Sequence, residues 1–126
     1  MREKAAPRPT DAELAILRVL WQRGPATVRE VHEDLSGTQD TGYTTVLKIL
    51  QIMTEKGLVV RSDDERTHVS SPKVPAERTQ RQMVRDLMDR VFGGSVQELV
   101  LQALGSGKVS AAELREIKKL LNKMES

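Results

Sequence analysis

The fold is decided by residues 43–70, whose sequence is YTTVLKILQIMTEKGLVVRSDDERTHVS. Apolar residues in the first half recur at spacings of three and four, which predicts an amphipathic helix ending near Gly57, a residue suited to a left-handed cap. Its expected core stripe is Val46, Ile49, Leu50 and Met53. The second half has two short β-prone runs, 58–61 and 67–70, around the polar turn 63–65. This pattern predicts a β-hairpin.

Two shorter helices are expected before this stretch. Each begins with a hydroxyl and a carboxylate three residues apart, the pattern of a capping box, first at residue 10 and again at residue 27. The apolar spacing predicts helices over 10–23 and 27–35. Three short helices followed by a hairpin is the order of a winged helix. The sequence therefore predicts a mainly α chain with a small β-hairpin wing, in which residues 10–72 form a winged helix-turn-helix domain.

The remaining residues, 73–126, are expected to form three amphipathic helices that start near residues 76, 95 and 110. Each apolar stripe needs a covering surface, which is either the hairpin domain or the same segment of a second copy. Because prolines and glycines separate these pieces from the rest, a second copy is favoured. We therefore predict a helical C-terminal dimerisation domain and a homodimer. The expected interface residues are Leu87, Val91, Leu99, Leu114, Ile117 and Leu121.

Composition narrows the class of protein but does not select DNA as a partner. The 126 residues include no cysteine, which excludes disulfides, thiolate metal sites and thiol nucleophiles. No apolar run approaches the roughly 20 residues of a membrane span, and no apolar stretch follows the charged N-terminus, so a cytoplasmic protein without a membrane partner is expected. The net charge of +2 does not identify a DNA-binding half of the chain, because residues 1–70 carry −1 and residues 71–126 carry +3. Residues 1–9 are expected to be a flexible arm.

The helix expected over 43–56 is the strongest candidate for a binding surface, because the second helix of a helix-turn-helix enters the DNA major groove with its N-terminus first. The polar side chains that avoid its core stripe are Thr44, Thr45, Lys48 and Gln51. Such side chains bond base edges and phosphates. A simpler interpretation stays open, in which the threonines are ordinary first-turn residues and Tyr43 is core. In the hairpin, Arg66 is a candidate phosphate contact, although the acidic turn favours a solvated tip.

Catalytic and metal-binding chemistry is poorly represented. The only histidines are His32 and His68, and neither has another histidine or a cysteine at the spacing of metal ligands. Asp63 and Asp64 are adjacent, so they would point apart rather than act as a catalytic pair. No glycine-rich phosphate loop follows a strand. We therefore expect no catalytic residue, no metal and no cofactor, and the protein is not expected to be an enzyme.

Five pieces of sequence occur in an order that one known family shares. They are PTDAEL at 9–14, LW at 20–21, VREV at 28–31, YTTVLKIL at 43–50 and KGLV at 56–59. With these residues the chain resembles the BlaI/MecI family of bacterial repressors. A looser likeness continues in the tail, at 99–101 and 120–123.

The resemblance implies a winged-helix domain followed by a helical dimerisation domain, and repression through palindromic operators in double-stranded DNA with TACA and TGTA elements. It also implies that the third helix is the recognition helix, with Tyr43, Thr44, Thr45 and Lys48 at the DNA. Antibiotic-responsive members are inactivated by a protease that cuts an Asn-Phe bond. Gln102-Ala103 stands at that place here, so cleavage by the same protease is not expected. The copper-responsive branch uses cysteines that this chain lacks, and the inducing signal is left open.

A second class of function fits the same pattern of elements. A winged helix can serve as a protein-interaction module without DNA binding, and the near-neutral N-terminal half with its acidic turn suits that alternative. DNA binding with a steep salt dependence would discriminate between the two, because phosphate contacts release counterions.

Overall fold

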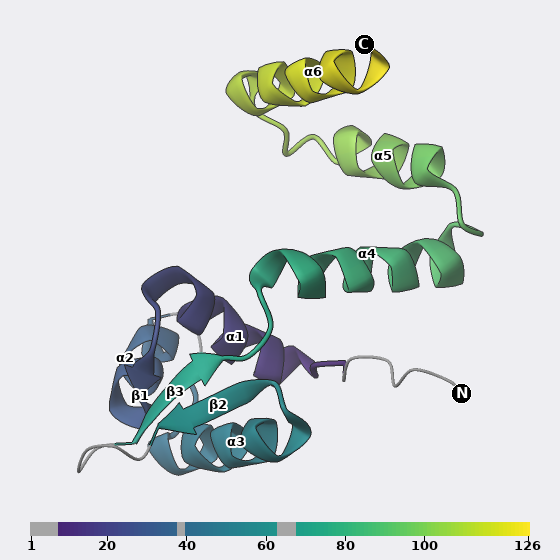
Figure 1. The fold of residues 1–126 in the computed structure, drawn as a ribbon. Coiled ribbons are helices and arrows are strands. Elements are labelled where there is room, and N and C mark those ends of the chain that lie inside the picture. Colours follow the sequence, from purple (N-terminus) through teal and green to yellow (C-terminus); the bar gives the residue numbers. More distant parts are fainter. Residues whose placement is uncertain (1–7, 38–39, 63–67) are drawn as a thin grey trace. The chain divides into compact units, whose positions relative to one another are not determined.

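The computed structural model describes residues 8–37, 40–62 and 68–126 (Figure 1). The chain forms two compact units, Met1–Met83 and Val84–Ser126. The elements in chain order are α1 (Asp11–Arg23), β1 (Ala26–Thr27), α2 (Val28–Ser36), α3 (Tyr43–Lys56), β2 (Val59–Ser62), β3 (Val69–Pro72), α4 (Ala76–Val91), α5 (Val96–Gly105) and α6 (Ala111–Glu125). The predicted fold class, mainly α with a small β wing, is confirmed. The unit boundary falls inside α4, and the functional division at residues 72 and 73 stays a prediction.

The N-terminal unit is built around one aliphatic core to which α1, α2, α3 and the start of the hairpin all contribute. The buried apolar residues are Ile16, Leu17, Leu20, Ala26, Val31, Leu35, Val46, Leu50, Met53, Leu58 and Val59. The predicted stripe of α3 is confirmed at Val46, Leu50 and Met53, while Ile49 packs against the core from a partly buried position. Full burial of a valine, leucine, isoleucine or methionine side chain contributes roughly 1.5–3 kcal/mol relative to exposure.

Both predicted capping boxes of this unit are formed. The Thr10 hydroxyl accepts from the Glu13 amide at 3.2 Å, and the Glu13 carboxylate accepts from the Thr10 amide at 2.8 Å. Thr27 and Glu30 repeat the pair at 3.2 and 2.9 Å. Four backbone amides at helix starts are thereby satisfied, which fixes where α1 and α2 begin.

The hairpin strands lie one to two residues further along the chain than the sequence predicted. The reason for β2 is that α3 ends in a left-handed cap at Gly57, and the Leu58 amide donates to Met53 at 2.9 Å. Leu58 therefore belongs to the helix cap, and pairing of the strands begins at Val59, opposite Pro72. The predicted turn at 63–65 lies outside the described residues.

A third strand was missed by the sequence analysis. The sheet order is β1-β3-β2, with Ala26 opposite Ser70 and Thr27 opposite Val69. Thr27 is extended, with φ −79° and ψ 166°, because it is also the N-cap of α2. One residue therefore ends a strand and caps a helix, and a strand of two residues has no period to recognise.

The C-terminal unit has the three predicted helices but no core of comparable burial. The last part of α4 belongs to it, and α5 and α6 follow after breaks at glycines with positive φ. Ser95 and Ser110 cap α5 and α6 by accepting from the amides of Glu98 and Glu113. Within residues 84–126, all of which are described, no side chain is classed as buried. Among the described helices, none combines the length and the hydrophobicity that a membrane span requires.

Candidate nucleic-acid interface

The helix α3 divides into a core face and a polar, exposed face. All five of its predicted site residues, Tyr43, Thr44, Thr45, Lys48 and Gln51, are exposed. Tyr43 keeps 48% of its surface accessible, which contradicts the simpler interpretation of this residue as core. Because the opposite face carries fully buried Val46 and Met53, the helix cannot rotate without exposing its core stripe. The packing thus fixes which side chains face outward.

The N-terminus of α3 differs from those of the other capped helices. Threonine or serine side chains cap α1, α2, α5 and α6, whereas the N-cap of α3 is Gly42, which has no side chain. The first-turn amides, beginning at Tyr43, therefore receive no side-chain cap. The partial positive charge of a helix N-terminus attracts anions, and an uncapped first turn offers free N–H groups to a phosphate.

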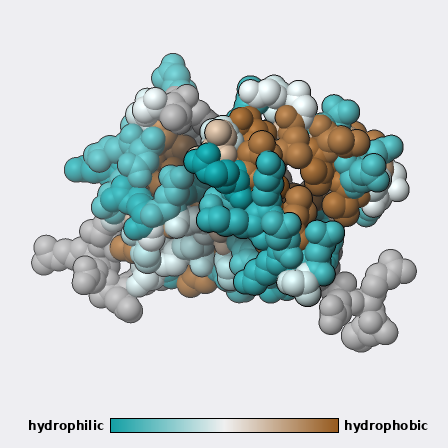
Figure 2. Space-filling view, turned by 90° about the horizontal axis from the view of Figure 1, so that it is seen from above, coloured by the Kyte–Doolittle hydropathy of each residue, from teal (hydrophilic) through white to brown (hydrophobic). Residues whose placement is uncertain are grey.

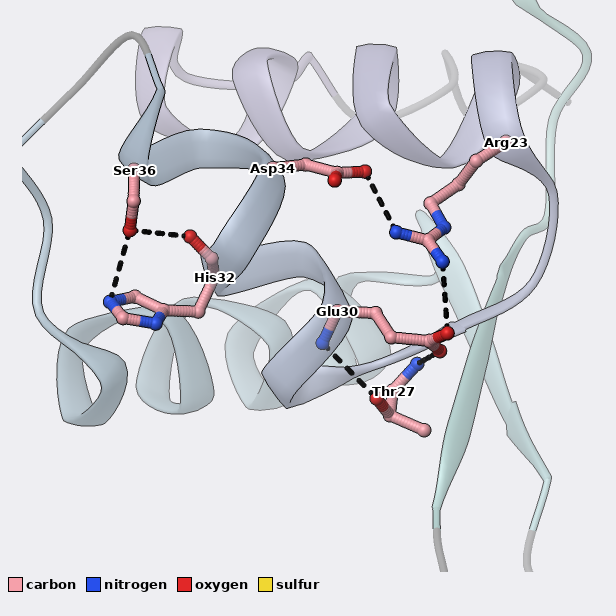
Figure 3. A network of polar contacts seen from close by, with 6 residues as sticks. All are labelled: Arg23, Thr27, Glu30, His32, Asp34 and Ser36. Carbon is pink, nitrogen blue, oxygen red and sulfur yellow. Dashed lines mark hydrogen bonds and ion pairs between the residues drawn. The ribbon is translucent and has the colours of Figure 1, made fainter.

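Tyr43 is oriented by a contact from α2 that the sequence analysis did not foresee. The rings of His32 and Tyr43 meet edge to face, with centroids 6.0 Å apart and planes at 77°. On its other side His32 is within 3.4 Å of the Ser36 hydroxyl, through Nε2, and this hydroxyl also donates to the His32 carbonyl at 2.8 Å (Figure 3). The half-buried imidazole thus links α2 to the first residue of α3.

A second set of polar contacts holds α1 against α2. The Arg23 guanidinium bonds Asp34 and Glu30, each at 2.9 Å, and Glu30 also completes the cap at Thr27 (Figure 3). The hydrogen bond that Arg23 donates to Asp34 is the main cause that raises the pKa of Arg23, and the bond that Glu30 accepts from the Thr27 amide is the main cause that lowers the pKa of Glu30. These groups are exposed, so their role is to set the angle between the helices rather than to add much stability.

The C-terminal end of α3 is tied to α1 by an ion pair with one buried partner. The Lys56 ammonium donates to both Glu13 oxygens at 2.9 Å, and the Glu13 side chain is only 4% exposed. Burial raises the pKa of Glu13, but bonds from the Thr10 amide and from Lys56 outweigh it, so the pKa is lowered overall. Glu13 therefore caps α1 and anchors α3 at once. These two residues are 43 apart in the chain, so no local pattern pairs them.

The other predicted site residues are Arg66 in the hairpin and the six expected dimerisation residues. Arg66 lies outside the described residues. The predicted dimerisation residues line α4, α5 and α6, where Leu87, Val91, Leu114 and Leu121 are exposed and Leu99 and Ile117 are half-buried. Trp21 on α1 is half-buried, and its indole N–H donates to the Val74 carbonyl at 3.1 Å. This bond ties the segment after β3 to α1. Among the residues that the structure describes, no group of three acidic or histidine side chains is placed to hold a metal ion.

The chain belongs to the penicillinase repressor family, whose sequence model matches residues 9–123. The resemblance to BlaI/MecI repressors is thereby confirmed. The transcriptional regulator BlaI of Mycobacterium tuberculosis is 46% identical over 63 residues, which cover 49% of this chain and 46% of that protein. The match thus spans about half the length of that relative. The penicillinase repressor of Bacillus licheniformis is 25% identical over 118 residues, which cover 94% of this chain and 92% of that protein.

Two solved structures share the fold. The solution structure of the DNA-binding domain of the repressor BlaI matches with a TM-score of 0.51 and 27% identity, over 59% of this chain and 90% of that domain. The solution structure of monomeric Bacillus licheniformis BlaI in complex with the blaP half-operator matches with a TM-score of 0.52 and 27% identity, over 60% of this chain and 92% of that one. Each solved chain is thus covered almost completely.

Proposed function

We propose that the protein is a transcriptional repressor that binds a palindromic operator in double-stranded DNA as a homodimer. The observation that carries this proposal is the exposed polar face of α3 with its uncapped N-terminus, held at fixed orientation by core packing on the opposite face. Support comes from a BlaI chain of the same fold that was solved on a half-operator. The protein acts by occupying DNA, needs no catalytic residue or cofactor, and works in the cytoplasm.

In this proposal α3 is the recognition helix. Thr44, Thr45 and Gln51 read base edges, through hydroxyl and amide hydrogen bonds and through contact of threonine methyls with thymine. Lys48 contacts the backbone, and the first-turn amides of α3 bind a phosphate. Tyr43, held by the edge of His32, contacts DNA beside that phosphate. The ion pairs of Arg23 with Glu30 and Asp34 hold α2 against α1 while DNA is bound.

The homodimer forms through the apolar faces of the C-terminal unit. Val91, Val96, Leu101 and Leu121 are each more than half exposed in the single chain, at 62, 60, 58 and 53%. Figure 2 shows hydrophobic atoms gathered in one region of the face that it draws, over the C-terminal helices. Exposed apolar patches of this kind mark association surfaces. Pairing places two recognition helices at half-sites about 34–36 Å apart, or a multiple of that distance, and effective concentration raises the affinity of the linked pair.

The test is fluorescence anisotropy of the protein on a TACA/TGTA palindrome and on a scrambled duplex, at two salt concentrations. We expect tighter binding to the palindrome and a steep loss of affinity with salt. Equal, weak and salt-insensitive binding to both duplexes would overturn DNA recognition. It would favour the protein-interaction alternative.

Two variants of α3 separate backbone contact from base reading. Lys48→Ala should weaken binding to both duplexes and lower the salt slope by about one. Thr45→Ala should reduce discrimination between the palindrome and the scrambled duplex, at a cost of about 1–3 kcal/mol on the palindrome. The matched control is Lys73→Ala, which removes an exposed charge after β3, near the C-terminal end of α3, and should leave the slope nearly unchanged. Wild-type binding by both α3 variants would contradict the assignment of the recognition helix.

Release from DNA follows a route other than the Asn-Phe cleavage of the antibiotic-responsive relatives. Gln102 and Ala103, at the corresponding place, are exposed on α5. Incubation with a protease of that specificity should therefore leave the chain uncut, as judged by mass spectrometry. Cleavage between these two residues would contradict this part of the proposal.

A further inference from the structure

A pocket of about 330 Å³ lies in the N-terminal unit, between α3 and the sheet. Its volume falls in the lower part of the range for small-molecule sites, about 300–1,000 Å³. The residues that line it include Leu47, Leu50, Gln51, Glu55, Arg61 and Ser70. Neither the core packing nor the proposed backbone contacts of α3 account for this space.

The strands direct two polar side chains to the same side of the sheet. Arg61 is paired with Ser70, and directly paired residues of an antiparallel ladder share a face. His68, one residue before β3, lines the same pocket. Across the pocket, α3 contributes Gln51 and Glu55, four residues apart on one side of the helix. Sheet and helix thus form opposite walls.

The walls carry opposite charges around an apolar base. Leu50 is buried, and Leu47 and Val28 add further apolar surface. The rim has a carboxylate on the helix side, Glu55, and a guanidinium on the sheet side, Arg61, both exposed. Ser70 and Thr54 add hydroxyl groups, although the Thr54 hydroxyl already donates to the Leu50 carbonyl at 2.8 Å. A ligand that complements this lining has an ammonium group, a carboxylate and an apolar side chain.

We propose that this pocket binds a free amino acid with an apolar side chain, with its ammonium group at Glu55, its carboxylate at Arg61 and its side chain against Leu47 and Leu50. The ligand regulates DNA binding, because Leu47 and Gln51 belong to both the pocket and the proposed recognition helix. An occupant between α3 and the hairpin contacts Leu47 and Gln51 and changes how this side of the recognition helix meets DNA, so it releases the repressor. The regulatory part of this inference rests on the proposed function, whereas binding of the ligand does not.

The first experiment measures ligand binding to the free chain of 126 residues, with L-phenylalanine as the probe and amide chemical shifts as the readout. We expect shifts at the lining residues and a dissociation constant on the order of millimolar, as suits a small, exposed site. Phenethylamine, which lacks the carboxylate, and 3-phenylpropionate, which lacks the ammonium group, should each bind about fivefold more weakly. No shifts at about 20 mM, or shifts confined to other residues, would overturn the proposal.

A charge variant tests the orientation of the ligand. Glu55→Gln should weaken L-phenylalanine about fivefold while leaving 3-phenylpropionate unchanged, because only the amino acid has an ammonium group. Glu33→Gln, an exposed carboxylate on α2 outside the pocket, is the matched control and should alter neither. Equal affinities of the wild type and Glu55→Gln for L-phenylalanine would overturn the assignment of Glu55.

The second experiment adds operator DNA. Saturating L-phenylalanine should weaken wild-type binding to the palindrome several-fold, and a given sub-saturating concentration should have a smaller effect on Glu55→Gln. If the free chain binds the amino acid but never binds DNA, the proposed function fails and the ligand site stands. If the chain binds DNA and L-phenylalanine changes neither the spectra nor the affinity, the ligand site fails and the proposed function stands.

Discussion

The two units of the chain carry the same kind of sequence pattern with opposite structural outcomes. In the N-terminal unit, leucines at helical spacing are buried, as with Leu20 at 0% exposure. In the C-terminal unit, Leu121 occupies the same kind of position on an amphipathic helix and is 53% exposed. Amphipathic periodicity therefore predicts that a face will be covered, but it does not say which surface covers it.

This difference in burial suits the two units to different roles. The core of the first unit holds α3 rigidly and fixes an outward polar face, which is what recognition of DNA requires. The second unit leaves its apolar faces exposed, so in the proposed homodimer its stability depends on association and hence on concentration. Substitutions of the same type in the two units should therefore be read out by different measurements.

The largest effect is expected from a charge placed on the exposed stripe. Leu121→Asp leaves the fold of the single chain intact, since the position is half exposed, but it buries two uncompensated carboxylates in the proposed homodimer. Loss of about 3 kcal/mol or more of association is expected, which should give monomers in sedimentation velocity. Lys118→Asp, on the same helix at an exposed polar position, is the control. A stable dimer of Leu121→Asp would place the interface elsewhere.

The next largest effect is expected on the free energy of unfolding of the N-terminal unit alone. Leu20→Ala should lower the free energy of unfolding of the N-terminal unit by about 2–5 kcal/mol, through lost burial and an unfilled cavity. The fluorescence of Trp21, the only tryptophan, follows this unit during urea unfolding. Leu121→Ala should leave that transition unchanged. Equal shifts for both variants would mean that the two units unfold together, and the comparison drawn above would be wrong.

The features that could be predicted from the sequence are those that depend on residues close together in the chain. The stripe of α3, the cap at Gly57 and the capping box of Thr10 are local, and the structure has all three. What could not be predicted depends on distant residues. The bond from Trp21 to Val74 and the pairing of β1 with β3 join segments more than 40 residues apart, which no local period encodes.

At the candidate site, too, local features could be predicted and contacts between distant segments could not. Exposure of Thr44, Thr45 and Lys48 follows from their places between the core positions of one helix, and the structure leaves these side chains exposed. The contact of His32 with Tyr43 crosses from α2 to α3, so the sequence offered only a lone histidine. The pocket requires the register of two strands against a helix, and the expected strands were displaced by one to two residues. A register error of one residue moves each side chain to the other face.

A smaller effect is expected at the ion pair that ties α3 to α1. Lys56→Met should cost about 1–3 kcal/mol at neutral pH, because it leaves the buried Glu13 carboxylate without its partner. The folded pKa of Glu13 lies below its ordinary value of 4.5, so the stabilisation is present above that pH and is lost as the pH falls through the folded pKa. Urea unfolding should show the difference between wild type and variant shrinking below about pH 4. A difference independent of pH would exclude the ion pair as its cause.

The smallest effect is expected from removing one helix N-cap hydroxyl in each unit. Thr27→Ala removes a hydroxyl that accepts from the Glu30 amide, and it should lower the free energy of unfolding of the N-terminal unit by about 1 kcal/mol, as followed by Trp21. Ser110→Ala removes the same kind of bond, to the Glu113 amide, at the start of α6. It should leave the Trp21 transition unchanged and reduce the helical circular dichroism of the dilute chain, where association no longer supports α6. If Ser110→Ala shifted the Trp21 transition as much as Thr27→Ala, the C-terminal helices would contribute to the stability of the first unit, and the two units could not be treated as separately stabilised parts.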